Sequence, residues 1–117
     1  MKKGDVYLAR LDPTRGSEQS GSRPVVIVSR DAINRASPVV LVVPCTSWTQ
    51  ERKLYPSQVL INAPDGGLTA DTIALCEQVR AIAKDRLADR WGMLAPPTID
   101  LLDRALLIAM DLPGQFR

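Results

Sequence analysis

The 117-residue sequence contains no histidine, and this absence excludes two large classes of site. Zinc sites with imidazole ligands are excluded, as are mechanisms in which a histidine passes a proton to or from a substrate. Cysteine is scarce as well: Cys45 and Cys76 stand in apolar stretches without the C-x-x-C spacing of metal and redox motifs. We therefore expect two buried, reduced thiols and a reducing compartment.

Long apolar runs are also missing. The longest, Val25 to Val28 and Val39 to Val43, fall far short of the roughly 20 residues needed to cross a bilayer. The basic start, Met1 to Asp5, leads into alternating sequence where a secretion signal would have an apolar stretch and a cleavage site. We expect a soluble, cytoplasmic protein with no membrane contact.

The composition is that of one ordinary globular domain, which we assign to residues 1–117. Hydrophobic residues make up 45% and charged residues 24%, so the chain should fold around a single core. Positive charge gathers in the first half, where residues 1–53 hold nine Lys/Arg against five Asp/Glu. This surplus fits a polyanionic ligand and fits a solvated charged face equally well.

Short alternating or β-branched segments predict a mainly β structure. Two of them have a proline near the start and none inside, which is where a central strand tolerates one. One helical turn is expected over Arg30 to Arg35, and one or two over Lys84 to Arg90. The expected strands are Asp5 to Leu11, Val25 to Val28, Val39 to Val43, Val59 to Ile61, Thr72 to Cys76, Val79 to Ile82 and Trp91 to Leu94.

Two polar segments and one helix complete the picture. Thr14 to Ser22 predicts a loop long enough to carry function, and Thr46 to Tyr55 predicts a mobile loop. From a cap at Thr98, apolar residues recur at helical spacing until Leu112-Pro113-Gly114. Short strands followed by one terminal helix, without long crossover helices, favour a small half-open barrel over a βαβ array.

Three segments in this order resemble the MazF/PemK family of toxin endoribonucleases. They are GDVYLARLDPTRGSEQSGSRPVVIVS from Gly4, VVPCTS from Val42 and LCEQVRAIAKDRL from Leu75. The resemblance implies an SH3-like half-open barrel of the MazF/PemK/CcdB type, with no metal and no cofactor. It also implies a homodimer that cleaves single-stranded RNA such as mRNA, inhibits growth and is held inactive by a cognate antitoxin.

The resemblance also carries over individual residues. The family's catalytic arginine, before the proline of RPV, falls on Arg23, and the threonine of its VPxTS segment falls on Thr46. The sequence departs from some members at Ser17, where they have histidine, and at Leu75, where they have arginine. Glu77 stands where those members have aspartate, which leaves the group that accepts the first proton open.

These residue types suit RNA cleavage, because RNA brings its own nucleophile in the 2′-hydroxyl. An arginine matches a phosphate with two parallel donors and stays charged, so Arg23 would stabilise the charge that grows on the phosphoryl oxygens. Thr46 would hold a phosphate oxygen with its hydroxyl. Glu18 and Glu77 are the candidate proton acceptors.

The predicted RNA contacts lie around these four residues. Glutamine amides can read base edges, and Trp48 offers a stacking face, although it fits partial burial in the core equally well. Without the resemblance, a charge before a strand, a strand-end threonine and polar turns would be ordinary surface features. The residues assigned to RNA contact are Lys3, Ser17, Gln19, Ser47, Trp48, Gln78 and Arg80.

Two other functions remain open for the same fold. One is a non-catalytic toxin like the gyrase-poison relatives, which act through the C-terminal helix; the tail Gly114 to Arg117 does not resemble their ending closely. The other is a binding module without chemistry. The helix also carries Leu101, Ile108 and Leu112 outside its core stripe, which predicts a homodimer.

Overall fold

A computed structural model describes residues 1–114, in which seven strands form a curved antiparallel sheet and one long helix covers it. The tail residues 115–117, used above to argue against a gyrase-poison ending, lie outside the described part. The strands are β1 Asp5–Arg10, β2 Ser22–Ile27, β3 Val39–Ser47, β4 Gln58–Ile61, β5 Thr72–Leu75, β6 Arg80–Ala83 and β7 Leu87–Met93. The helices are α1 Asp31–Ala36 and α2 Pro96–Met110, with the 3-10 turns η1 Asp65–Gly67, η2 Cys76–Gln78 and η3 Lys84–Arg86.

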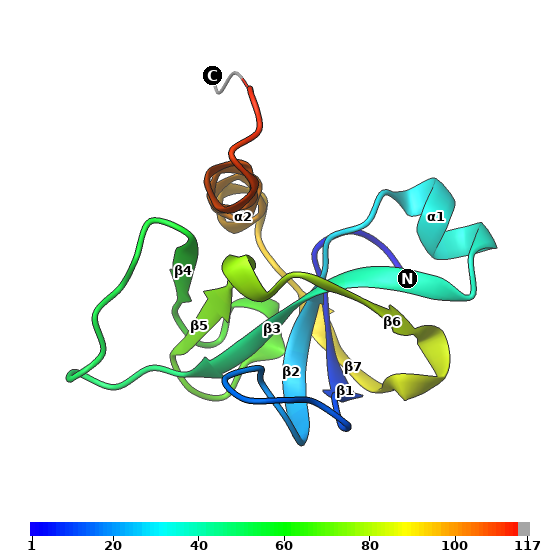
Figure 1. The fold of residues 1–117 in the computed structure, drawn as a ribbon, viewed down its shortest axis with the longest axis horizontal. Coiled ribbons are helices and arrows are strands. Elements are labelled where there is room, and N and C mark those ends of the chain that lie inside the picture. Colours follow the sequence, from blue (N-terminus) through cyan, green and yellow to red (C-terminus); the bar gives the residue numbers. More distant parts are fainter. Residues whose placement is uncertain (115–117) are drawn as a thin grey trace.

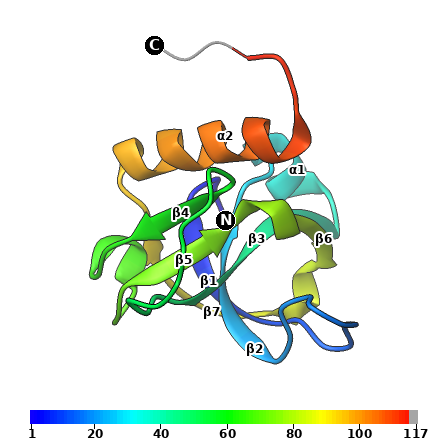
Figure 2. The ribbon, with the colours of Figure 1, turned by 60° about the vertical axis from the view of Figure 1, so that its left-hand side comes forward.

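Strand β3 joins the two halves of the sheet. The strand order is β4-β5-β3-β2-β1-β7, and β6 pairs with β3 outside this path. Over Val39 to Val42, β3 pairs with β6, and over Cys45 to Ser47 it pairs with β5, while β2 pairs with its middle part. The sheet curls into the expected half-open barrel, and α2 lies across one side of it, over β4 and η2 (Figures 1 and 2).

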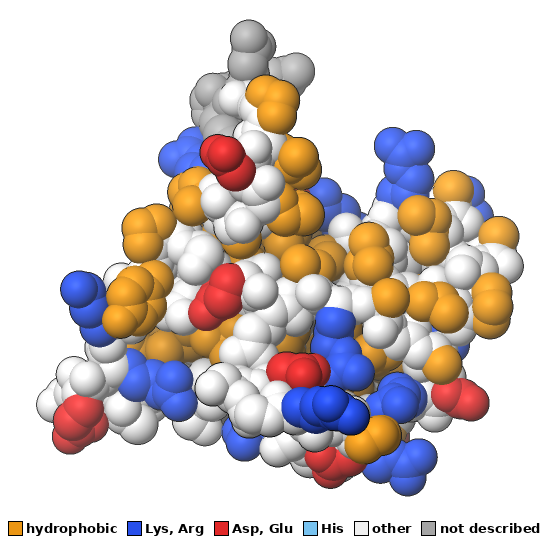
Figure 3. Space-filling view, in the orientation of Figure 1, with side chains coloured by type: hydrophobic (Ala, Val, Ile, Leu, Met, Phe, Trp, Pro, Cys, Tyr) orange, Lys and Arg blue, Asp and Glu red, His pale blue; other side chains and the backbone are white. Residues whose placement is uncertain are grey.

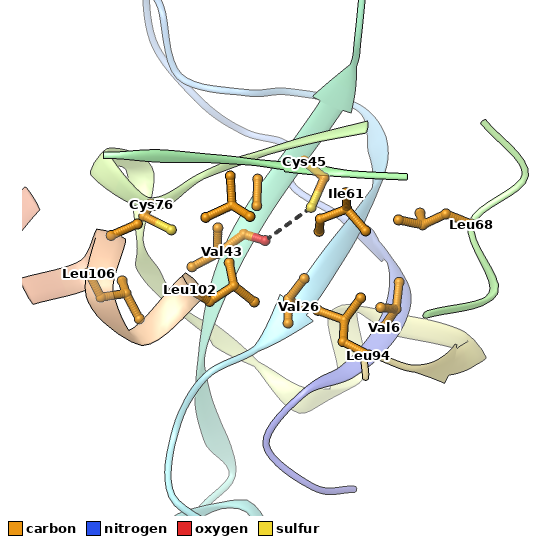
Figure 4. Packing of buried hydrophobic residues seen from close by; sticks show 13 residues of the cluster. Val6, Val26, Val43, Cys45, Ile61, Leu68, Cys76, Leu94, Leu102 and Leu106 are labelled. Atoms are coloured by element: carbon orange, nitrogen blue, oxygen red, sulfur yellow. Dashed lines mark hydrogen bonds between the residues drawn. The ribbon is translucent and has the colours of Figure 1, made fainter. Parts of the chain in front are cut away.

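The barrel has two apolar clusters, one on each face of its central strands. Val26 and Val43 point into the cluster under α2, whereas their neighbours Val25 and Val42 point into the cluster toward β6. Successive strand residues face opposite sides, so runs such as Val25-Val26-Ile27 are buried on both faces. The cluster under α2 also includes Cys45, Ile61, Leu68, Cys76, Leu94, Leu102 and Leu106 (Figure 4).

Both cysteines are free and buried, as the sequence predicts. Burial, together with the negative charges of Glu77 and Asp103, raises the pKa of Cys76 to about 12. Burial also raises the pKa of Cys45. Within residues 1–114, neither helix has the length and apolar content to cross a membrane.

Strand β3 is longer than predicted. The prediction ended at Val43 and began a mobile loop at Thr46, but the strand continues through Pro44 to Ser47. Pro44 falls between the residues paired with β6 and those paired with β5, where a missing amide donor is tolerated. The loop after β3 therefore begins at Trp48, and Thr46 is held rigidly within the strand.

The turn prediction at Lys84 to Arg90 is half wrong. Only the first three residues form the 3-10 turn η3, and β7 begins at Leu87 because it pairs with Ala9 of β1. The cap predicted at Thr98 is also wrong: α2 begins at Pro96, two residues earlier, where a proline needs no amide partner. The Thr98 hydroxyl instead donates a hydrogen bond to the Asp65 carboxylate in η1.

Candidate functional site

A pocket of about 240 Å³ lies between the β1–β2 loop and the turn η2. Its wall combines loop side chains with residues that follow β5, about 60 positions later in the sequence. Acidic and basic side chains lie together over the β1–β2 loop (Figure 3). The lining residues are Glu18, Gln19, Pro44, Glu77, Gln78, Val79 and Arg80. The structure thus brings five of the predicted site residues to one pocket.

The β1–β2 loop is anchored to the barrel at its base and at its tip. At the base, the guanidinium of Arg86 donates to the carbonyls of Arg10 and Asp12, and Arg80 donates to the Leu11 carbonyl at 3.4 Å. At the tip, the Gln19 amide N–H donates to Oε1 of Gln78 at 2.9 Å. The Gln78 Nε2 in turn donates to the Ser17 carbonyl at 3.4 Å, so Ser17 also lies beside the pocket.

Arg23 lies on β2 opposite Ala9 of β1 and is half-buried. Its Nε donates a hydrogen bond to the Ser20 carbonyl at 3.1 Å, which fixes the plane of the guanidinium. Within residues 1–114 the two terminal nitrogens make no other hydrogen bond or ion pair, so they present a pair of donors of the kind that matches a phosphate.

Thr46 lies on β3, two residues beyond the last residue that pairs with β2. Val25 of β2 pairs with Pro44 of β3, and extending this antiparallel register by two residues puts Arg23 opposite Thr46. Pro44 lines the pocket, so both residues belong to the end of β2 and β3 that borders it. Thr46 is only 6% exposed and pairs with Ile73 of β5.

The two candidate proton acceptors differ in what they already bind. Both carboxylate oxygens of Glu77 accept hydrogen bonds, Oε1 from the Ser57 hydroxyl at 3.3 Å and Oε2 from Gln58 Nε2 at 2.8 Å. In contrast, Glu18 accepts a single long bond, from the Arg15 N–H at 3.3 Å, within the described part of the chain. Glu18 is therefore the freer acceptor.

The remaining predicted contacts lie farther out. Ser47 is exposed at the end of β3, and the next residue, Trp48, is half-buried with its N–H bonded to the Asp71 carbonyl. The prediction that Lys3 belongs to this site is not supported, because its Nζ forms an ion pair with Asp103 of α2 at 2.8 Å. Asp103 lies on the C-terminal helix, so the residues around Lys3 give no indication of this ion pair.

Sequence reasoning missed the residues that support the site. Ser20 orients Arg23, while Ser57 and Gln58 bind both oxygens of Glu77. The last two lie 20 and 19 residues from Glu77, at a spacing that corresponds to no motif. No group of three or more His, Cys, Asp or Glu side chains that could hold a metal is found among residues 1–114.

The fold and the pocket define a class: a small antiparallel barrel with a polar pocket whose lining includes guanidinium, amide and carboxylate groups. Residues 2–110 match the family described as PemK-like, MazF-like toxin of type II toxin-antitoxin systems. The chain belongs to this family, as the resemblance of its three segments predicts.

Named relatives match the chain along almost its whole length. Endoribonuclease EndoA of Bacillus subtilis is 43% identical over 112 residues, covering 96% of both chains. Endoribonuclease MazF9 of Mycobacterium tuberculosis is 40% identical over 117 residues, covering 96% of this chain and 98% of the relative.

Solved structures share the fold. An endoribonuclease in complex with its cognate antitoxin, from a mycobacterial species, superposes with a TM-score of 0.80 at 29% identity, covering 98% of this chain and 99% of that one. MazF from Deinococcus radiodurans superposes with a TM-score of 0.81 at 22% identity, covering 96% and 97%. These likenesses confirm the predicted mainly β toxin fold with a C-terminal helix.

Proposed function

We propose that this toxin is an endoribonuclease that cleaves single-stranded RNA, including mRNA, at the pocket beside the β1–β2 loop. The observation that carries the proposal is that Glu18, whose carboxylate accepts a single hydrogen bond among the described residues, lines the pocket, and that the Arg23 guanidinium is bonded to Ser20 of the same loop. The two named relatives at 43% and 40% identity, both called endoribonucleases, support it.

The proposed reaction uses the 2′-hydroxyl of the RNA as the nucleophile. Glu18 accepts the proton of this hydroxyl as its oxygen bonds to the adjacent phosphorus, and the bond from phosphorus to the 5′-oxygen breaks. Arg23 stabilises the charge on the phosphoryl oxygens, and the Thr46 hydroxyl donates to one of them. The departing 5′-oxygen takes its proton from water, which reaches the pocket along its exposed Glu77 side.

The chemistry of the product ends tests this reaction. Incubation with a long single-stranded RNA in excess EDTA should leave a 2′,3′-cyclic phosphate, or the 3′-phosphate formed by its opening, and a 5′-hydroxyl. Mass spectrometry of the fragments distinguishes these ends. The variant Arg23→Ala is the control for contaminating nucleases. Fragments with 5′-phosphates, or cleavage that requires Mg²⁺, would contradict the mechanism.

We also propose that the enzyme selects its cleavage sequence and acts in the cytoplasm. The half-buried Trp48 at the exit of β3 offers a face on which a base can stack, and the Gln19 amide offers a base-reading edge. Two free, buried cysteines fit a reducing compartment. Sequencing the 5′-ends of transcripts after expression of the toxin should give a single consensus, with translation falling as mRNA is cut.

We further propose a homodimer that uses the outer face of α2. Leu101 and Ile108 of α2 are 50% and 52% exposed, and Leu112, which the sequence assigned to the helix but which lies just beyond its end at Met110, is 51% exposed. An open groove of about 290 Å³ beside it, between α2 and β4, is largely apolar as well. Sedimentation at micromolar concentration should show a dimer that Ile108→Asp dissociates, whereas a purely monomeric wild-type protein would refute the proposal.

A cognate antitoxin is the proposed inhibitor, and it would cover the RNA pocket with a flexible acidic and apolar segment. The solved relative bound to its cognate antitoxin supports a partner of this kind. Carboxylates of that segment would lie where phosphates lie, and its apolar side chains would replace stacked bases. Titrating the toxin–antitoxin complex with fluorescent, non-cleavable RNA tests this, because RNA should bind the free toxin far more tightly. Equal affinity would place inhibition elsewhere.

A further inference from the structure

Two glutamines line the pocket, and their hydrogen bonds show that they differ in function. Both atoms of the Gln78 carboxamide are used within the protein: Oε1 accepts from the Gln19 N–H, and Nε2 donates to the Ser17 carbonyl. The carboxamide oxygen of Gln19, in contrast, is not used within the described part of the protein. This atom, Oε1, is buried and has no hydrogen-bond partner among the described residues.

The β1–β2 loop depends on the hydrogen bonds with Gln78, because its outer residues make few stabilising contacts themselves. The consecutive residues from Arg15 to Glu18 are exposed, and both glycines of the loop have positive φ, 57° at Gly16 and 73° at Gly21. A side chain added at either glycine would meet nothing within 4 Å. The outer part of the loop, residues 15–18, therefore gains little packing energy from the barrel, and hydrogen bonds have to hold it in place.

The bonds at the base of the loop cannot position its tip. Arg80 and Arg86 bind carbonyls of residues 10 to 12, before the loop turns outward. Among residues 1–114, both hydrogen bonds that connect Ser17 and Gln19 to distant parts of the chain end on Gln78. Glu18 lies between these two bonded residues, so Gln78 holds the main chain on both sides of it.

Gln78 is itself firmly held. It ends the turn η2, whose first residue, Cys76, is fully buried under α2, and the Val79 N–H closes the turn on the Cys76 carbonyl at 3.2 Å. The next residue of the turn, Glu77, is held by Ser57 and Gln58 near the start of β4. A rigid part of the barrel is thus connected to the flexible loop through one carboxamide.

We infer that Gln78 is a positioning residue, which holds the β1–β2 loop so that Glu18 faces the RNA, and that Gln19 is the glutamine that contacts the substrate. The inference rests on the proposed ribonuclease function and replaces the sequence-based expectation that both amides read bases. The buried Gln19 Oε1 needs a donor, and a base amino group or a ribose hydroxyl supplies one in the complex.

Amide hydrogen exchange of the RNA-free toxin tests the positioning role directly. In Gln78→Ala the Gln19 N–H loses its acceptor, so its exchange should speed up by about tenfold, as expected for one lost hydrogen bond. Gln78→Glu keeps an acceptor oxygen and should restore most of the protection. Gln50→Ala, a change at an exposed glutamine, should leave this amide unaffected. A thermal melt checks that each variant is folded.

Cleavage kinetics test the division between the two glutamines. Gln78→Ala should lower kcat by about tenfold with an unchanged KM and an unchanged cleavage sequence, and Gln78→Glu should recover part of kcat. Gln19→Ala should instead raise KM and relax the preference at one nucleotide. The inference is wrong if Gln78→Ala changes the preferred nucleotide or leaves the exchange of the Gln19 N–H as in wild type. A wild-type protein that cuts no RNA would refute the proposed function alone, because the exchange experiment needs no RNA.

Discussion

The cluster under α2 and the pocket beside the β1–β2 loop are held together by different forces. Under α2, aliphatic side chains such as Leu102 and Val43 are almost fully excluded from water. Around the pocket, exposed polar side chains and main-chain groups are joined by single hydrogen bonds. Stability and the proposed activity therefore depend on separate sets of residues, which meet at the turn η2.

The largest expected effect concerns the two thiols on the stable side. Cys45 and Cys76 should react with a thiol reagent at least 10³-fold more slowly in the native protein than in guanidinium chloride, because exposure requires global unfolding. Ellman's reagent at pH 8 measures both rates. A native thiol that reacts as fast as the unfolded one would show that this cluster opens locally.

The same burial predicts a pH dependence of stability. The pKa of Cys76 is raised from 9.0 to about 12 in the folded protein, so the neutral thiol is favoured there. The neutral Cys76 thiol therefore contributes to the free energy of unfolding fully below about pH 9, and this contribution is lost as the pH rises toward 12. Urea unfolding at pH 8 and pH 10 should show a lower midpoint at the higher pH, and Cys76→Ala should reduce the difference.

The next largest effect is expected when a substitution creates a cavity in the cluster under α2. Leu102→Ala should lower the free energy of unfolding by about 2–5 kcal/mol, because the side chain is 2% exposed and its neighbours cannot fill the space. Below its melting temperature, the variant should cut RNA at the wild-type rate. The matched control, Leu54→Ala at an exposed position, should change stability by no more than about 0.5 kcal/mol. Equal losses of stability in the two variants would show that burial under α2 does not determine the size of the effect.

On the pocket side, Arg23→Ala should lower the cleavage rate by about 10²-fold or more, because it removes the donor pair that stabilises the phosphoryl charge. Arg23→Lys should restore the activity only partly, since a point charge cannot donate two parallel bonds. The melting temperature should stay near that of wild type, and Arg35→Ala on α1 is the matched control. Wild-type cleavage by Arg23→Ala would refute the assignment.

The smallest effect is expected at Lys3. Its ion pair with Asp103 joins side chains that are 38% and 36% exposed, so solvent screens it and Lys3→Ala should change stability by about 0–1 kcal/mol. RNA binding, followed by fluorescence anisotropy with a non-cleavable RNA, should stay within about twofold of wild type. A tenfold loss of affinity would return Lys3 to the RNA surface, where the sequence analysis placed it.

Local patterns in the sequence predict the central part of the fold well. The β-branched runs around Val26 and Val43 and the terminal helix are all found, since each is encoded by its own residues. The end of β3, the start of β7 at Leu87 and the pairing of Lys3 depend on partners far along the chain. No local periodicity reports such partners.

The site divides in the same way. Arg23 and Thr46 are predicted as site residues because they stand in continuous motifs of a known family. The bonds from Gln78 to the β1–β2 loop span 59 and 61 residues and join a side chain to main-chain atoms, so they leave no pattern of residue types to recognise. The sequence could propose which residues are functional, but the hydrogen bonds that hold the loop are seen only in the structure.

The pairing of β1 with β7 has a consequence for synthesis of the chain. Ala9 can pair with Leu87 only after the ribosome has added all of the intervening sequence. At about 5–20 residues per second, this takes on the order of 4–15 s. Throughout that interval one edge of β1 carries unpaired N–H and C=O groups, open to any other extended chain. We expect newly made toxin to be most prone to misassembly, and most dependent on chaperones, during these seconds.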